Sequence, residues 1–179
     1  MSMTWKEYRE CLDYELFRFH PATTRLQRFR VKWMQPNTAC MHACRLMWYL
    51  HSRGGVKMAL AKLLYLHILH RYGCCIYPAA KVARGFYIAH PVGIVIGNCT
   101  IGRDFCIFQN CTVGTSRHGW DAKGYVPQIG NGVTMYANSL IVGRVRVADG
   151  VTLGANSLIL HDAPQSGTYV GSPARFVGA

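Results

Sequence analysis

The sequence predicts an all-β parallel β-helix built from six-residue repeats and preceded by an α-helical segment. Two observations predict this fold class. Between residues 76 and 159, apolar residues recur at every sixth position, interrupted by one slip and one insertion. Before the repeat, apolar residues instead follow the three-to-four-residue spacing of amphipathic helices. The period of the apolar pattern therefore changes once, near residue 74.

The composition narrows the class of protein. The chain has 179 residues, half of them apolar, which suits one core with a helical appendage and excludes wholesale disorder. Its formal charge is +12, from 20 Lys and Arg against 8 Asp and Glu. No run approaches the roughly 18–20 uncharged apolar residues of a membrane span, and the first ten residues do not resemble a secretory signal. We therefore expect a cytoplasmic protein.

Four helices are expected in residues 1–73. Proline and glycine mark their limits, at Pro21, Pro36, Gly54 with Gly55, and Gly73. The expected helices cover residues 5–19, 23–34, 37 or 38 to 51, and 56–72, with Asn37 or Thr38 capping the third. A short β-helix has open ends, so we expect this segment, residues 1–73, to cover the first coil.

Residues 74–179 carry the six-residue repeat. Its apolar positions are Ile76, Val82, Ile88, Ile94, Ile101, Ile107, Val113, Ile129, Met135, Ile141, Val147, Leu153 and Ile159. Three residues after many of them stands a residue type that tolerates a left-handed backbone: Gly85, Asp104, Asn110, Gly132, Asn138, Gly150 and Asn156. This alternation predicts a short strand and then a tight turn. Three such units form a triangular coil, and the coils stack into a parallel β-helix.

Two motifs connect the repeat to a known family. They are the run IAHPVGIVI at residues 88–96 and the ending VGSPAR at residues 170–175. With the repeats, they resemble the hexapeptide-repeat acetyltransferases, in particular the serine acetyltransferase-like enzymes, including those of capsule and colanic acid synthesis. The resemblance implies a left-handed β-helix, which departs from the usual right-handed crossover. It also implies a homotrimer with active sites between subunits, and acetyl-CoA as the acetyl donor.

The resemblance places the catalytic histidine at His90. A base near neutral pH would take a proton from an acceptor hydroxyl, whose oxygen then attacks the thioester directly. Counting the repeats places Gln109, Ala137 and Ala155 below His90 on the same face, at about 4.8 Å per coil. We therefore expect Gln109 to lie beside His90 and to orient it, and the two alanines to form a smooth strip.

The same resemblance assigns the donor and acceptor sites. It places Gly114, Thr115, Ala137 and Ala155 along the cofactor, and Arg175 can pair with a phosphate of CoA. The insertion at residues 114–128 is too long for a turn, and such loops are often functional. Its chemically useful side chains, which we expect to bind the acceptor, are His118, Trp120, Asp121, Lys123 and Tyr125.

Three departures from the family pattern bear on the acceptor. Serine acetyltransferases carry Asp before the catalytic His, a second Asp fifteen residues earlier, and an Arg-His pair before the proline of the loop. Here these positions hold Ala89, Cys75 and Tyr125-Val126. The sequence alone thus favours a sugar hydroxyl of a surface polysaccharide or its precursor as the acceptor. L-serine, and a β-helix that binds without catalysis, remain alternatives.

Other classes of function have less support. Cys40, His42 and Cys44 lack a second ligand pair for a structural metal site, so we expect no metal and eight reduced, packing cysteines. No nucleic-acid-binding module is recognised. The charge is concentrated in residues 1–73, with 12 basic and 4 acidic residues, against 8 and 4 in the rest. An anionic glycan, a solvated face and the anionic inner face of a membrane are the open explanations.

Overall fold

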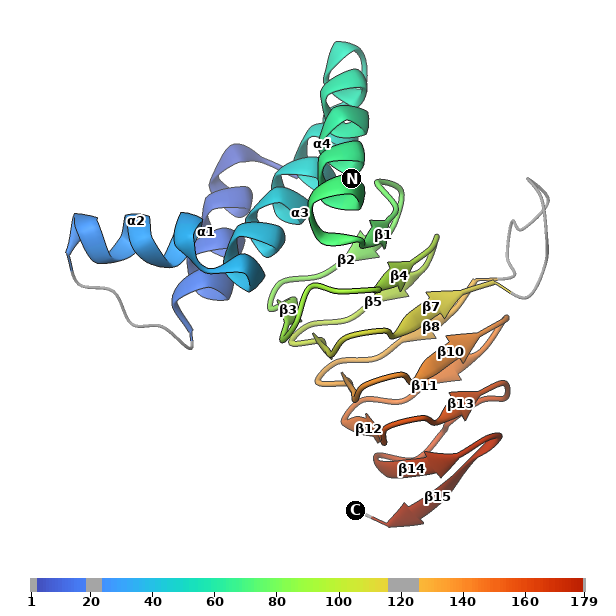
Figure 1. The fold of residues 1–179 in the computed structure, drawn as a ribbon. Helices are drawn as coiled ribbons and strands as arrows, with labels where there is room; N and C mark the ends of the chain where they lie inside the picture. Colours follow the sequence, from blue (N-terminus) through green and yellow to red (C-terminus); the bar gives the residue numbers. More distant parts are fainter. Residues whose placement is uncertain (1–2, 19–23, 116–125, 179) are drawn as a thin grey trace.

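The computed structural model of the protein describes residues 3–18, 24–115 and 126–178. Four helices, α1 (Trp5–Phe17), α2 (Arg25–Met34), α3 (Pro36–Arg53) and α4 (Val56–Tyr72), precede a stack of short strands. Figure 1 shows the helices grouped at one end of the stack and the carboxyl terminus at the other. The helices pack against the first coil through α3 and α4, which contact β3 (Tyr87–Ile88) and β1 (Cys75–Ile76).

The helix limits follow from local chemistry. Thr4 and Thr24 each form a capping box, with Glu7 and Gln27 as the reciprocal partners. The expected cap of the third helix at Asn37 or Thr38 is wrong. That helix begins at Pro36, because proline lacks the N–H that a first helical position leaves unpaired. The first helix ends two residues earlier than expected, and the fourth has the expected limits.

The β-helix consists of three sheets of parallel strands, one for each side of the triangular coil. Sheet A contains β1, β4 (Val95–Ile96), β7 (Thr112–Gly114), β10 (Leu140–Val142) and β13 (Leu158–Ile159). Sheet B contains β2 (Lys81–Val82), β5 (Thr100–Ile101), β8 (Gln128–Ile129) and β11 (Arg146–Val147). Sheet C contains β3, β6 (Cys106–Ile107), β9 (Thr134–Met135) and β12 (Val151–Leu153), followed by an antiparallel hairpin of β14 (Gly167–Gly171) and β15 (Ala174–Gly178).

The turns have the backbone that the repeat predicts. Asp104, Asn110, Asn138 and Asn156 adopt positive φ angles of 56–60°. Asn and Asp are the residues other than glycine that occupy this region most readily. Each of the three asparagines also stands at an exposed corner between two strands. The expected strand-turn alternation is therefore confirmed.

One apolar position of the repeat is displaced. Ile96, not Ile94, pairs with Ile76 above and Val113 below, and it is the inward residue of β4. The step from Ile88 to Ile96 is eight residues, and the next, to Ile101, is five. Ile94 is also fully buried, in the corner that precedes β4. The corner between β3 and β4 is therefore two residues longer than the repeat requires, and His90 lies in it.

The core continues from the helices into the coils. Trp48 of α3 packs edge-on against Phe86, with ring centroids 5.3 Å apart, and its indole N–H donates to the carbonyl of Tyr77 at 3.1 Å. All eight cysteines are free, and Cys40, Cys44, Cys74, Cys99 and Cys111 are buried. Burial raises the pKa of Cys99 to about 12. None of the described helices is long and apolar enough to cross a membrane.

Candidate functional site

His90 lies at the exposed corner between sheets C and A. Its carbonyl accepts a hydrogen bond from the N–H of Val92 at 2.9 Å, which closes the corner. Its ring lies across that of Phe108, with centroids 6.2 Å apart and planes at 67°. Phe108 in turn lies 5.0 Å from Tyr136. The imidazole is thus accessible to solvent on one side and bounded by an aromatic row on the other.

The aromatic row was not expected from the sequence. Phe108 and Tyr136 each follow an inward residue, Ile107 and Met135, so they point outward at equivalent positions of neighbouring coils. The same repeat that places Gln109 below His90 also places these rings beside it. The repeat therefore contains the information that places these rings. Each stands one position before a residue of the predicted column, Phe108 before Gln109 and Tyr136 before Ala137.

The predicted column below His90 is present. Ile88 pairs with Ile107, Ile107 with Met135, and Met135 with Leu153. Two residues after these positions come His90, Gln109, Ala137 and Ala155. The N–H of Asn138 donates to the Gln109 carbonyl at 3.1 Å, and that of Asn156 to the Ala137 carbonyl at 3.0 Å, so the corners stack directly. The two alanines leave the strip beneath His90 and Gln109 low and open.

Gln109 has an unusual side chain. Its Oε1 atom is buried and accepts no hydrogen bond from any of the described residues. A buried amide oxygen without a partner costs about 1–3 kcal/mol. Such groups are rare in folded proteins unless a ligand, a water or another subunit supplies the donor. Gln109 therefore carries an unsatisfied acceptor within the column.

The other predicted site residues do not lie next to His90 in the single chain. Arg175 lies on β15, at the far end of sheet C, five strand steps or about 24 Å from the level of His90. Gly114 ends β7 and Thr115 follows it, at the corner between sheets A and B, so the width of sheet A separates them from the column within one chain. The predicted acceptor residues, namely His118, Trp120, Asp121, Lys123 and Tyr125, lie outside the described residues.

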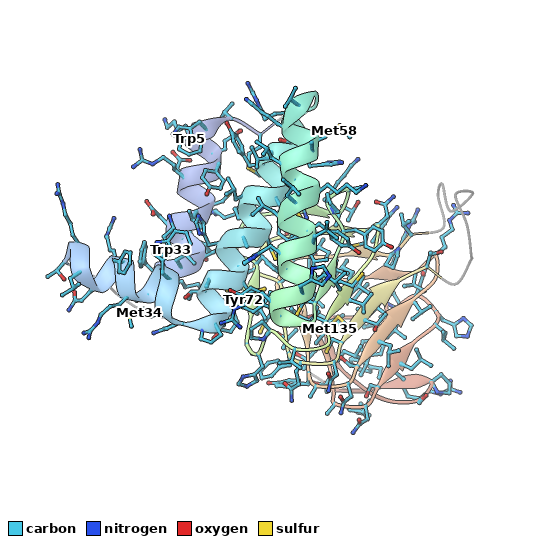
Figure 2. The ribbon with its side chains drawn as sticks, turned by 45° about the horizontal axis from the view of Figure 1, so that its top comes forward. Trp5, Trp33, Met34, Met58, Tyr72 and Met135 are labelled. Atoms are coloured by element: carbon cyan, nitrogen blue, oxygen red, sulfur yellow. The ribbon has the colours of Figure 1, made fainter. Side chains whose placement is uncertain are left out.

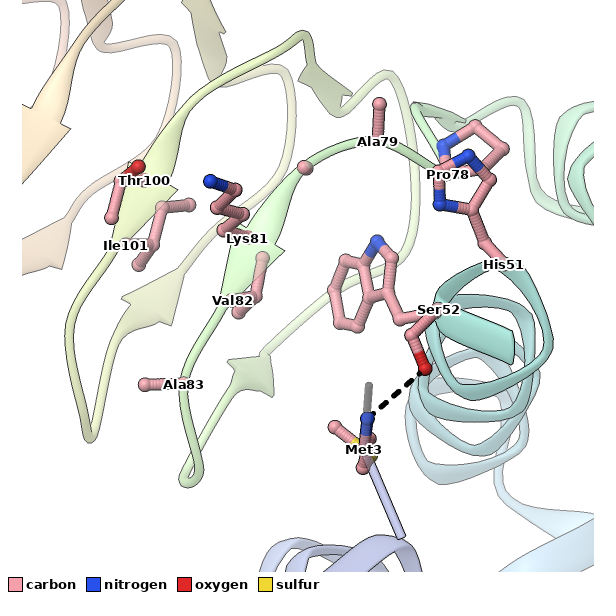
Figure 3. A pocket seen from close by; sticks show the side chains of 12 residues that line it. Met3, His51, Ser52, Pro78, Ala79, Lys81, Val82, Ala83, Thr100 and Ile101 are labelled. Atoms are coloured by element: carbon pink, nitrogen blue, oxygen red, sulfur yellow. Dashed lines mark hydrogen bonds between the residues drawn. The ribbon is translucent and has the colours of Figure 1, made fainter. Parts of the chain in front are cut away.

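A pocket lies away from this column. It has a volume of about 540 Å³ and is formed where the end of α3 faces strands β2 and β5 of sheet B. Figure 3 shows it between His51 and Ser52 on one side and Lys81 and Thr100 on the other, with the Met3 N–H donating to Ser52 Oγ at 3.3 Å. It contains none of the predicted site residues. Within the described ranges, no three His, Cys, Asp or Glu side chains are placed to hold a metal ion.

Several known proteins are similar to this chain in sequence. The serine acetyltransferase of Helicobacter pylori is 36% identical over 155 residues, which are 83% of this chain and 87% of the relative. Serine acetyltransferase 5 of Arabidopsis thaliana is 40% identical over 120 residues, 66% of this chain. The chain spans only 38% of the Arabidopsis relative and 50% of the relative from Escherichia coli K12. No protein-family model matches the chain.

Solved structures agree with the predicted fold. The serine acetyltransferase of Neisseria gonorrhoeae superimposes with a TM-score of 0.83 at 27% identity, covering 98% of this chain and 68% of that chain. A serine acetyltransferase in complex with CoA gives a TM-score of 0.76 at 25% identity, over 97% and 71% of the two chains. The expected fold, a left-handed parallel β-helix preceded by helices, is confirmed.

The same relatives correct the expected acceptor. The prediction of a polysaccharide acceptor rested on Ala89, Cys75 and Tyr125-Val126, which replace charged residues of the family pattern. That prediction is wrong, because the proteins similar to this chain over most of its length are serine acetyltransferases. Four substituted positions do not outweigh similarity along 155 residues. The chain therefore belongs to the serine acetyltransferase family of hexapeptide-repeat O-acetyltransferases.

Proposed function

We propose that the protein transfers the acetyl group of acetyl-CoA to the side-chain hydroxyl of L-serine. The observation that carries this proposal is the Helicobacter pylori relative, of which this chain covers 87% at 36% identity. Two structural neighbours add support, since one was solved with CoA and another, from Neisseria gonorrhoeae, with serine. We propose that this reaction takes place in the cytoplasm.

In this proposal His90 is the general base. Its exposed imidazole accepts the proton of the serine hydroxyl, and the oxygen forms a bond to the thioester carbonyl carbon. The carbon–sulfur bond then breaks, and the proton passes from the imidazole to the sulfur of CoA. A histidine suits this role because its ordinary pKa lies near neutral pH. The chemistry requires no acyl-cysteine, and Cys111, the cysteine nearest the column in sequence, is buried.

The column below His90 suits the arm of CoA. Two methylene groups separate the sulfur of CoA from its first amide, a length comparable to the single strand step from His90 to Gln109. The Oε1 of Gln109 is buried and without a partner in the free chain, and a rotation of the side chain would bring it to that amide N–H. Ala137 and Ala155 leave room for the rest of the arm, and Arg175 stands at the level where the phosphates would arrive. Through this contact, Gln109 would position acetyl-CoA next to His90.

We further propose that the protein is a homotrimer that shares its sites. The outward side chains of sheet A include Val95, Leu140 and Leu158, which stand in one row with Thr112 and are left partly exposed in a single chain. Covering this row would bury apolar area, which stabilises association. Gly114 and Thr115 lie across sheet A from His90 in the same chain, so a neighbouring chain must bring them to the column. The site as proposed is incomplete in one chain.

Release of CoA tests the reaction. The purified protein is mixed with acetyl-CoA and L-serine, D-serine, L-threonine or a panel of sugars, and the free thiol of CoA is measured. We expect release with L-serine, reduced by about 10²–10⁴-fold in His90→Ala, while binding of CoA is retained. His161→Ala is the matched control, because His161 is also exposed but lies outside the column.

Three results would contradict the proposal. Release that is faster with another acceptor than with L-serine would overturn the substrate. Equal activity of His90→Ala and the wild type would remove the assigned base. Binding of neither acetyl-CoA nor CoA at millimolar concentration would show that the chain is a β-helix without this catalytic function.

A further inference from the structure

Helix α2 exposes an apolar stripe that the acetyltransferase function does not use. Leu26, Phe29 and Trp33 are 66%, 58% and 54% exposed. Their spacings of three and four residues place them on one face of the helix. Val31 is the one residue of α2 that is buried, and it lies on the opposite side of the helix. Figure 2 shows α2 at the edge of the molecule, with Trp33 and Met34 near its carboxyl end.

Helix α2, which carries the stripe, is folded without a bound partner. Thr24 and Gln27 close both ends of a capping box at its first turn. At its last turn the Trp33 ring rests edge-on against His42 of α3, with centroids 5.0 Å apart. A preformed helix does not have to fold when it binds, so less conformational entropy is lost. The exposed side chains are therefore presented in fixed positions.

Basic side chains border the stripe. Arg25 lies on one side of it and Arg30 on the other, both exposed, and α2 also carries Arg28 and Lys32. The helix contains no acidic residue, and none occurs anywhere in the sequence between Glu15 and Asp104. Asp13 of α1 acts on Lys32, but α2 itself carries four positive side chains and no negative one, and this charge favours a negative binding partner.

The positive charge and the exposed apolar area of α2 together indicate which class of partner fits it. A nucleic acid would engage the arginines but leave leucine, phenylalanine and tryptophan without apolar contacts. A second copy of the same face would bring like charges together. An anionic bilayer suits both features, since large apolar side chains enter the boundary of the acyl chains while cations contact lipid phosphates. We propose that α2 attaches the protein peripherally to an anionic membrane surface.

Sedimentation with vesicles tests this proposal. Vesicles of phosphatidylcholine mixed with phosphatidylglycerol are compared with vesicles of phosphatidylcholine alone. We expect the wild-type protein to sediment with the anionic vesicles only, and to be released at high salt. Leu26→Ser/Phe29→Ser and Arg25→Glu/Arg30→Glu should each lower the bound fraction by at least about tenfold, without change in CoA release.

Matched variants separate α2 from general properties of the surface. Val56→Ser/Leu63→Ser removes two exposed apolar residues from α4, and Arg144→Glu/Arg146→Glu makes the same charge change on the β-helix. Both should bind vesicles as the wild type does. Binding to neutral vesicles, no binding to anionic ones, or equal losses in the α4 control would overturn the proposal. A smaller oligomer in Leu26→Ser/Phe29→Ser, measured by light scattering, would assign the face to a second copy instead.

Discussion

Glu15 of α1 and Arg45 of α3 form a buried ion pair at the junction of the helices and the first coil. Arg45 Nε donates to Glu15 Oε2 at 3.1 Å, a second guanidinium nitrogen contacts Oε1, and neither side chain is more than 1% exposed. The pair also hydrogen-bonds four backbone groups of the first coil, at distances of 2.9–3.1 Å: the N–H groups of Gly85 and Phe86 and the carbonyls of Val82 and Ala83. It therefore satisfies polar groups at the end of the β-helix.

Glu15→Gln should destabilise the protein strongly, because it leaves the Arg45 charge buried without its counter-ion. Removal of one partner of a buried pair costs about 3–5 kcal/mol. The free energy of unfolding, measured with urea, should fall by that amount. Glu10→Gln is the control, because Glu10 belongs to an exposed pair with Lys6 and such pairs contribute little. Equal stabilities of the two variants would contradict the role given to the junction.

Gly102→Ala should destabilise the β-helix, whereas Gly114→Ala should not. A methyl group at Gly102 would lie 2.6 Å from the carbonyl of Gly130 in the next coil, and backbone has little room to move. At Gly114 the nearest atom would be 3.8 Å away. The expected loss for Gly102→Ala is about 1–3 kcal/mol, measured by thermal unfolding. A higher KM for acetyl-CoA in the stable Gly114→Ala variant would place the donor beside Gly114, and an unchanged KM would argue against that contact.

Ala155→Leu should raise the KM for acetyl-CoA by about tenfold or more, since a leucine would stand in the strip that the arm of CoA occupies. Ala155 is exposed, so the stability of the protein should not change. Ala79→Leu is the control, because Ala79 is equally exposed but lines the pocket on sheet B. The proposed path of CoA would be wrong if both variants kept the wild-type KM.

His42 should make the protein less stable as the pH falls. Burial lowers the pKa of His42 to about 4, with a smaller contribution from the positive charge of Lys32. In the unfolded chain the pKa is about 6.5, so the unfolded state takes up the proton first. Above pH 6.5, His42 therefore does not lower the free energy of unfolding. Between pH 6.5 and 4 that free energy falls by about 1–3 kcal/mol, a range that allows for solvent screening. Unfolding in urea at several pH values measures it.

The pH effect has its own control. Between pH 6.5 and 4, the free energy of unfolding of His42→Leu should fall less than that of the wild type. His161→Leu should behave as the wild type, because His161 is exposed. A wild-type slope in His42→Leu would show that another group causes the loss.

Ala89→Asp should increase kcat/KM with L-serine by about tenfold, because a carboxylate next to the base stabilises the imidazolium that forms. The apparent pKa of the base in the pH–rate profile should also rise. Ala89→Asn has the same shape without the charge and should produce neither change. A decrease in rate with Asp and Asn alike would show that residue 89 limits space at the site rather than charge.

Much of the fold followed from the sequence because its period is a local property. Counting six-residue repeats predicts every inward residue except that of β4, together with the positive-φ asparagines and the alignment of Gln109 with His90. The fourth inward residue was misplaced because Ile94 and Ile96 are both apolar and both buried, and only pairing with Ile76 distinguishes them. The third helix begins before the predicted Asn37 or Thr38, because Pro36 occupies the first helical position and no side-chain cap is present.

The sequence by itself determined the repeat, the position of His90 and the family, since each depends on residues at fixed spacing along the chain. Tertiary structure decided what surrounds His90. The rings of Phe108 and Tyr136, the buried oxygen of Gln109 and the ion pair of Glu15 with Arg45 depend on which coils stack and how far a corner extends. The distance of Gly114 from His90 across sheet A has the same origin. These contacts join residues that are remote in the chain, so no local period encodes them.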